Sequence, residues 1–250
     1  MRNIKLEIEY EGTNYCGWQS QKNLISNKDT IQDTIQDVIE KITGLRIVLE
    51  GSGRTDAGVH ALGQVANFFI DSKILTERFA FALNSALPHD IVIKSSSEVD
   101  MDFHSRYSAV GKQYSYLMIN SRQPTALYRN LAYHISYCDR LDINKMRAAS
   151  KYFIGEYDFS SFMSKGSSIK NTVRTIYDIK IVQNEEFIKI TYHGNGFLYN
   201  MVRIISGTLL SAAIGKIEPS NIQDIMLSKN RPQAGITLPA HGLYLEKVFY

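Results

Sequence analysis

The N-terminal part of the chain switches between strand-like and helix-like hydrophobic periods. Residues 4–10 alternate apolar and polar side chains, which indicates a strand with one buried face. Thr30 and Asp33 are placed to cap a following helix, and Gly44 is placed to end it. The apolar side chains between them repeat at helical spacing: Ile31, Ile35, Val38, Ile39 and Ile42.

Four further elements complete this first set. Strands are predicted at residues 45–49 and 64–70, and another begins at residue 91. A second helix is predicted from about Thr76 until Pro88 blocks its continuation. The order strand, helix, strand, strand, helix, strand is that of a ferredoxin-like split βαβ unit.

The second half repeats this order. The predicted elements are a strand at 109–120, a helix capped by Asp142 and ended by Gly155, a hairpin of strands at 176–182 and 187–192, a helix at 199–213, a short helix opened by Pro219-Ser220 and a strand at 242–250. We therefore predict an α+β fold of two ferredoxin-like halves, residues 1–105 and 106–250. No linker-like stretch separates them, so we expect one continuous mixed, mainly antiparallel sheet with a central active-site cleft.

Composition narrows the class of protein. Hydrophobic residues make up 44% and charged residues 21%, as in ordinary soluble globular proteins. A formal net charge of +3 permits nucleic-acid binding without requiring it. The N-terminus is charged where a secretion signal needs an apolar run. The most apolar stretch, residues 204–214, is too short to span a membrane. We expect a cytoplasmic protein without a membrane partner.

Cysteine and histidine positions do not suggest a metal site. Cys16 and Cys138 have no ligand partners at the spacing of zinc sites, and two isolated cysteines are typical of reduced cytosolic thiols. The six histidines are scattered, without a His-x-x-x-His pair. We therefore expect no metal.

The most distinctive stretch is Gly51–His60, a glycine-rich loop between two predicted strands. Its glycines allow positive φ and a close approach of backbone to a ligand. Asp56, its only carboxylate, is two residues from Arg54, its only guanidinium. Such an arginine favours the ionised carboxylate, which is the form that acts as a nucleophile. The same pattern also fits a tight structural turn held by an Arg–Asp pair.

Other glycine-rich motifs do not fit this loop. A dinucleotide-binding fingerprint needs a third glycine where Asp56 stands, and a helix rather than a strand afterwards. A phosphate-binding loop needs Gly-Lys-Ser/Thr, and an EF-hand needs alternating Asp or Asn with a terminal Glu.

Residues 53–60, Gly-Arg-Thr-Asp-Ala-Gly-Val-His, closely resemble the signature loop of the tRNA pseudouridine synthase A family. In that family the loop's aspartate is the nucleophile, which here is Asp56. Supporting matches follow in order along the whole chain: residues 17–19, 83–88, 102–106, 158–162, 172–176, 197–203 and 242–245. Two places depart from the family pattern, a slightly extended segment at 24–29 and Ser105 where alanine is usual.

Two more side chains are candidates for the chemistry. Tyr114 and Tyr116 share one face of a predicted strand, either as core aromatics or with one ring stacking on a base. The resemblance favours Tyr114 as the active-site tyrosine. Arg203 enters an otherwise apolar helix, so it needs a partner or a path to solvent. The resemblance implies that it lies beside the aspartate and orients Asp56.

Candidates for substrate binding are less specific. Arg106, Lys112 and Arg174 are possible phosphate contacts, although any one of them also fits a solvated surface. Trp18, within a segment that matches the family, is a further candidate.

The resemblance implies isomerisation of uridine to pseudouridine in the anticodon arm of tRNA, on the 3′ side of the loop and the adjoining stem. It implies that Arg54 takes the space of the flipped-out base or binds its phosphate, while Tyr114 stacks on the uracil. No cofactor is expected, because the reaction has no net redox change or hydrolysis. Family members are homodimers. Two alternatives remain open: a related synthase that acts on ribosomal RNA, and an RNA-binding protein without catalysis.

Overall fold

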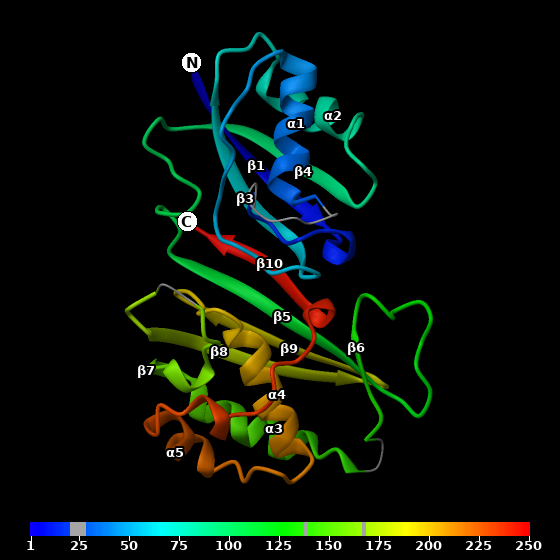
Figure 1. Cartoon of the computed structure of the whole chain (residues 1–250), viewed down its shortest axis with the longest axis vertical. Helices are drawn as coiled ribbons and strands as arrows, with labels where there is room; N and C mark the ends of the chain where they lie inside the picture. Colours follow the sequence, from blue (N-terminus) through cyan, green and yellow to red (C-terminus); the bar gives the residue numbers. More distant parts are fainter. Residues whose placement is uncertain (21–28, 138–139, 167–168) are drawn as a thin grey trace. The chain divides into compact units, whose positions relative to one another are not determined.

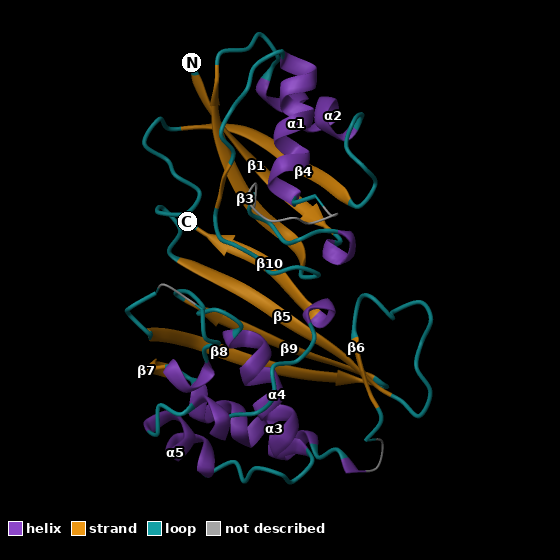
Figure 2. Cartoon of the chain, in the orientation of Figure 1, coloured by secondary structure: helices purple, strands orange, loops and turns teal. Residues whose placement is uncertain are grey.

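Helices cover one face of a sheet in each of the two units of the chain (Figures 1 and 2). The first unit contains Met1–Val110 and Tyr244–Tyr250, and the second contains Gly111–Leu243. The structure is a computed structural model that describes residues 1–20, 29–137, 140–166 and 169–250. Cys138 and the extended segment before Asp29 lie outside the described residues.

The first unit has the strand order of a split βαβ fold. Its elements are β1 (Arg2–Tyr10), α1 (Ile31–Thr43), β2 (Glu50–Gly51), β3 (His60–Ile70), α2 (Phe79–Asn84), β4 (Ile91–Val99) and β10 (Leu243–Phe249). β1 pairs antiparallel with both β3 and β4, and β2 pairs antiparallel with β3. The order β4-β1-β3-β2 confirms the arrangement that was predicted for this half. β10 pairs in parallel with the first two residues of β3, His60 and Ala61.

The boundaries of α1 follow from its capping residues. The Thr30 side chain accepts a hydrogen bond from the Asp33 backbone N–H, and Gly44 ends the helix in the left-handed conformation with φ 72°. Of the predicted apolar stripe, Ile31, Ile35, Val38 and Ile39 are buried. The second predicted helix begins as a 3-10 turn at Thr76–Arg78, continues as α2 and ends at Asn84.

The strand predicted at residues 45–49 is not formed, and that prediction is wrong. Side chains of α1 take the hydrogen bonds that a neighbouring strand would have made. The Leu49 backbone N–H donates to Gln36 Oε1 over 2.9 Å, and the Leu49 carbonyl accepts from Gln32 Nε2 over 2.7 Å. The extended stretch therefore runs beside the helix, and only Glu50–Gly51 pairs with β3.

The second unit holds a sheet in the order β5-β9-β8-β7 with antiparallel neighbours. Its elements are β5 (Gly111–Asn120), β6 (Tyr133–Ile135), α3 (Ile143–Ser150), β7 (Gly155–Asp158), β8 (Val173–Asn184), β9 (Phe187–Gly194), α4 (Met201–Ala213) and α5 (Asn221–Leu227). The Asp142 cap, the hairpin between β8 and β9, and both later helices confirm the prediction. β6, parallel to β5, and β7 are strands that were not predicted.

An α+β fold with mainly antiparallel pairing is confirmed. The division into halves at residue 105 stays a prediction. The two units divide the chain between Val110 and Gly111, and Tyr244–Tyr250 belongs to the first unit. Among the described residues, no helix has the length and apolar character needed to cross a membrane.

Candidate active site

Asp56 opens a tight turn that leads into β3. The Val59 backbone N–H donates to the Asp56 carbonyl oxygen over 3.1 Å, and Gly58 has φ 78° at the third position of the turn. A positive φ at that position is what a type II turn requires, and glycine adopts it without strain. Asp56 is half-buried and Arg54 is exposed.

Buried polar groups of β3 hold one side of this loop. The Ser52 backbone N–H donates to the Val65 carbonyl, and Ser52 Oγ donates to Gln64 Oε1 over 2.6 Å. Gln64 Nε2 in turn donates to the Gly53 carbonyl over 3.0 Å. Ser52 and Gln64 are both fully buried. A buried polar network that is satisfied in this way specifies one backbone conformation.

The chain between β1 and α1 holds the other side of the loop. Tyr10 Oη and Thr55 Oγ1 share a buried hydrogen bond of 2.8 Å. Burial raises the pKa of Tyr10, and the bond to Thr55 opposes that rise. The Trp18 backbone N–H donates to the Thr55 carbonyl over 3.1 Å, and the Gly12 N–H donates to His60 Nδ1 over 3.1 Å. The backbone on both sides of Asp56 is therefore fixed.

Two glycines allow these segments to approach the loop. A Cβ at Gly12 would overlap the Val59 carbonyl, and a Cβ at Gly17 would overlap the Thr55 carbonyl. Gly17 also has φ 89°, a conformation that side chains disfavour. The spacing of glycines in this part of the chain thus has a packing reason.

Trp18 supports the loop, and its contact with the substrate stays a prediction. Its side chain is 2% exposed, and a Cβ at Gly51 would overlap the indole ring. The ring of Tyr10 lies 6.1 Å from that of Trp18, centroid to centroid. The indole is thus packed inside the first unit.

Tyr114 and Tyr116 lie on β5 in the second unit with different surroundings. Tyr116 is fully buried, and its hydroxyl donates to the Pro239 carbonyl over 2.7 Å, as expected of a core tyrosine. Tyr114 is 8% exposed and meets the ring of Phe197 edge to face at 5.2 Å. A catalytic role for Tyr114 stays a prediction.

Arg203 is half-buried in the apolar helix α4 and is held by groups of its own unit. Its Nε donates to the Leu238 carbonyl over 2.7 Å, and its Nη1 donates to Asn200 Oδ1 over 2.7 Å. Burial lowers the pKa of His241, and the nearby Arg203 charge adds to this effect. The guanidinium therefore has a defined position, while its predicted pairing with Asp56 stays a prediction.

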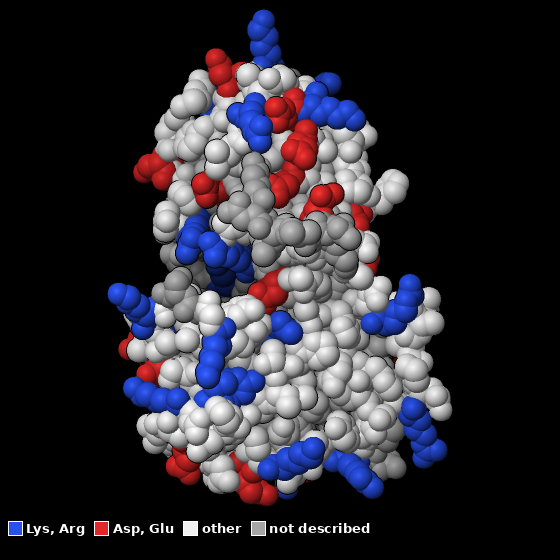
Figure 3. Space-filling view, in the orientation of Figure 1, with Lys and Arg blue, Asp and Glu red and all other residues white. Residues whose placement is uncertain are grey.

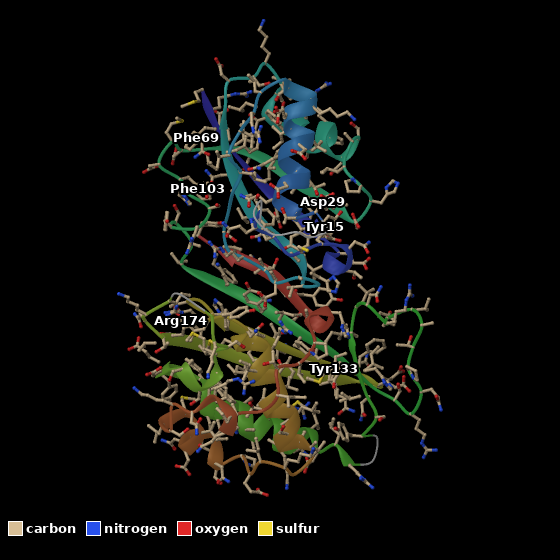
Figure 4. All side chains as sticks on the ribbon, in the orientation of Figure 1. Tyr15, Asp29, Phe69, Phe103, Tyr133 and Arg174 are labelled. Carbon is tan, nitrogen blue, oxygen red and sulfur yellow. The ribbon has the colours of Figure 1, made fainter. Side chains whose placement is uncertain are left out.

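The three basic candidates differ in what their side chains contact. Arg174, labelled in Figure 4, donates hydrogen bonds from Nη1 to the carbonyls of Asn171 and Val173, over 3.0 and 2.6 Å. Burial lowers the pKa of Arg174. Arg106 is exposed, with its guanidinium 5.7 Å from the centroid of the Tyr107 ring. Lys112 is half-buried near the start of β5.

The surface over α1 has the opposite charge. Figure 3 shows acidic side chains gathered over this helix, where the sequence places Asp33, Asp37 and Glu40. A polyanion is repelled from such a face. Within the ranges that the structure describes, no group of three or more His, Cys, Asp or Glu side chains is arranged to hold a metal ion.

Sequence reasoning missed the side chains that support the loop. Tyr10 and Gln64 were taken as ordinary strand residues, although Tyr10 bonds Thr55 and Gln64 bonds Ser52 and Gly53. One local signal was present. Gln64 begins an apolar strand, and a glutamine there needs a hydrogen-bonding partner when it is buried.

Comparisons with known proteins identify the family of this chain. A family model described as tRNA pseudouridine synthase matches residues 7–108 and 149–250. The tRNA pseudouridine synthase A of Acetivibrio thermocellus is 54% identical over 250 residues, which cover all of both chains. Proteins of the same name from Caldicellulosiruptor saccharolyticus and Thermoanaerobacter sp. are 53% and 50% identical, again over the full length of each chain. The chain belongs to the tRNA pseudouridine synthase family.

Proposed function

We propose that this chain isomerises uridine to pseudouridine in tRNA, with Asp56 as the nucleophile. The target is the anticodon arm, on the 3′ side of the loop and the adjoining stem. One observation carries the assignment of Asp56. Its loop backbone is fixed on both sides by buried hydrogen bonds, while Asp56 itself remains only half-buried. Such a preorganised carboxylate suits nucleophilic catalysis.

The reaction needs only groups that the chain supplies. Asp56 attacks the nucleotide, either at the uracil ring or at the sugar C1′. The bond between C1′ and N1 breaks, the uracil turns, a bond forms between C1′ and C5, and the bond to Asp56 breaks again. C5 then loses its proton and N1 gains one. The product is an isomer of the substrate, so no oxidant, reductant or water is consumed.

The other side chains prepare the uridine and the nucleophile. A stacked base hides its reacting face, so the uridine must leave the helix before attack. Arg54 is exposed and takes the space of the flipped base or binds its phosphate. Tyr114 stacks on the uracil, and Arg203 orients Asp56.

Binding of a whole tRNA calls for more positive charge than one chain carries. Net charge is +3, and the surface over α1 is acidic. We therefore propose a homodimer, in which a second chain doubles the charge and extends the surface that grips the tRNA. Arg106, Lys112 and Arg174 are the candidate phosphate contacts. The cytoplasm, where the tRNA substrate is found, is the proposed location.

The central test replaces Asp56 with asparagine, which keeps the size of the side chain and removes its charge. We expect Asp56→Asn to form no pseudouridine while it binds tRNA within about threefold of the unchanged protein, because it loses only the nucleophile. Mass spectrometry of treated tRNA measures the product, and filter binding measures affinity. Asp37→Asn, on the exposed face of α1, is the matched control and should remain fully active.

Three outcomes would redirect the assignment. Pseudouridine formation by Asp56→Asn would exclude Asp56 as the nucleophile. Loss of pseudouridine from ribosomal RNA alone, in cells that lack this protein, would assign it to ribosomal RNA. Binding of tRNA without any isomerisation by the unchanged protein would identify a non-catalytic RNA-binding protein.

A further inference from the structure

Asn200 has an unusual backbone conformation at the start of α4. Its φ and ψ are 61° and 7°, in the left-handed region that residues other than glycine rarely occupy. Only Glu185 and Lys229 share a positive φ among the described non-glycine residues. Asparagine tolerates this conformation better than most residues, yet it still costs free energy. Something in the surroundings must therefore hold it there.

The side chain of Asn200 does not cap the helix that it precedes. An asparagine at this position ordinarily accepts a hydrogen bond from one of the first helical N–H groups, and Asn200 makes no such bond. Its Oδ1 instead accepts from Arg203 Nη1 over 2.7 Å. Asn200 thus makes no capping hydrogen bond and has a strained backbone, and its amide oxygen accepts a hydrogen bond from the Arg203 guanidinium instead.

Ser164 fixes which way this amide faces. Asn200 Nδ2 donates to Ser164 Oγ over 2.9 Å, so the Oδ1 atom is left on the side of Arg203. The Ser164 backbone N–H also donates to the Tyr199 carbonyl over 3.1 Å. Two hydrogen bonds therefore tie Ser164 to the turn that contains Asn200. With the bond from Nε to Leu238, the Arg203 guanidinium is held at two nitrogens.

We propose that Asn200 is a positioning residue for Arg203. It supplies a neutral acceptor that sets the direction of the guanidinium without cancelling its charge. An aspartate here would form an ion pair with Arg203 and neutralise the guanidinium. A glycine would relieve the backbone strain and leave the guanidinium without this acceptor. The inference rests on the proposed function, in which Arg203 orients the nucleophile.

A double-mutant cycle of Asn200→Gly and Arg203→Lys tests this role. Glycine adopts the left-handed backbone without strain, which offsets part of the loss of two hydrogen bonds, and thermal unfolding measured beside the rate separates positioning from folding. We expect Asn200→Gly to slow single-turnover pseudouridine formation at saturating tRNA by about ten- to a hundredfold, because a group that acts in the reaction is misplaced. Its affinity for tRNA should stay within about threefold of the unchanged protein.

The double-mutant cycle distinguishes a rate loss that arises through Arg203 from a rate loss that is independent of Arg203. If Asn200 acts through Arg203, the double variant should be no slower than Arg203→Lys alone, because the two changes then remove the same contribution. Glu185→Gly is the matched control, since Glu185 in the hairpin between β8 and β9 also has a left-handed backbone, with φ 52°. It should leave the rate unchanged and combine additively with Arg203→Lys.

Two results would overturn the inference: an unchanged single-turnover rate in Asn200→Gly, or rate losses for Asn200→Gly and Arg203→Lys that multiply in the double variant. Failure of the proposed function is a separate result, because the unchanged protein would then form no pseudouridine in tRNA.

Discussion

Glycines around Asp56 join neighbouring segments backbone to backbone. Gly12, Gly17 and Gly51 each lie where a Cβ would overlap an atom of the loop or of Trp18. The overlapped atoms at Gly12 and Gly17 are backbone atoms, which cannot rotate away as a flexible side chain can. A side chain at either position must therefore displace the turn that carries Asp56.

Gly17→Ala and Gly44→Ala form a matched pair that measures this constraint. Both glycines have positive φ, 89° and 72°, but a Cβ at Gly44 would meet nothing within 4 Å. Gly44→Ala should lower the free energy of unfolding by about 1 kcal/mol, from the left-handed backbone alone. Gly17→Ala bears the same strain and also overlaps Thr55, so it should lose more stability. It should also form pseudouridine more slowly at temperatures where it stays folded.

Thermal unfolding and single-turnover assays on the two variants give the comparison. Equal losses of stability in both, with full activity in Gly17→Ala, would show that the loop tolerates displacement.

Among single residues, the sequence predicts those whose signal lies within one short stretch. Asp56 and Arg54 stand two residues apart in one glycine-rich loop, so the stretch was recognisable without a structure. The burial of Trp18 was not, because it depends on Gly51, a residue distant in sequence that leaves room for the indole. The acceptor for Arg203 Nε was not recognisable either, because it is the backbone carbonyl of Leu238, which follows α5 in the sequence.

Elements defined by caps and periodic apolar faces were predicted well. α1 has a threonine cap, a stripe of buried isoleucines and a terminal glycine, all of which are readable in the sequence. Residues 45–49 show the limit of such patterns. Their β-branched composition favours a strand, yet Gln32 and Gln36 of α1 bind both backbone groups of Leu49. Competition from side chains of another element is not visible in a local window.

β7 was missed for a related reason. Gly155–Asp158 is short and polar, so it lacks the alternation that marks a strand, and it exists through its pairing with β8. Its last residue, Asp158, has three partners. Oδ1 accepts from Thr172 Oγ1 over 2.6 Å and from the Ser160 N–H over 3.0 Å, and Oδ2 lies 2.8 Å from Lys229 Nζ. This carboxylate connects the hairpin of β7 and β8 to the turn after α5.

These contacts make the stability of the second unit depend on pH. Burial alone would raise the pKa of Asp158, but the hydrogen bonds from Lys229, Thr172 and Ser160 outweigh it and hold the pKa well below its usual range. Because the folded-state pKa is depressed, the stabilisation is fully present above the unfolded-state value of about 4 and is lost as pH falls toward the folded-state value.

Asp158→Asn should therefore unfold at a lower temperature than the unchanged protein at neutral pH, and this difference should shrink as pH falls below about 4. Thermal unfolding followed by circular dichroism at a series of pH values measures it. Glu156→Gln, which removes an exposed carboxylate of the same strand, is the control. A difference in unfolding temperature that stayed constant down to the lowest pH would exclude the ionised Asp158 as its source.

For the whole molecule, the main prediction concerns assembly on tRNA. If a homodimer binds tRNA through many phosphate contacts, we expect its affinity for tRNA to fall steeply with salt concentration. On duplex nucleic acid the logarithm of the binding constant changes with the logarithm of the salt concentration with a slope near −0.9 per contact, because each contact releases counterions. Arg106→Ala removes one exposed arginine, so it should make that slope shallower by about one, the contribution of a single phosphate contact. Light scattering on the free protein gives its mass directly. A monomer that modifies tRNA at full rate at micromolar concentration would contradict the dimer.

The order of the longer strands and helices along the chain was predictable, and the partner of the last strand was not. Hydrophobic alternation identifies β10 as a strand but carries no information about which edge it joins. In its parallel pairing with β3, Tyr244 lies opposite His60, and their rings are 4.8 Å apart although the whole second unit separates them in the sequence.

This return of the chain to its first unit has a consequence for biosynthesis. A ribosome makes Met1–Val110 early, but the strand that pairs with the start of β3 emerges only after all of Gly111–Leu243. Until then that part of the β3 edge has unpaired backbone groups, which is the condition under which nascent chains pair wrongly with one another. The Tyr250 hydroxyl, which donates to the Ser105 carbonyl over 2.7 Å, is also made late. The loop that bears Asp56 leads directly into this edge, so the sheet beside the nucleophile is completed only after β10 has been made.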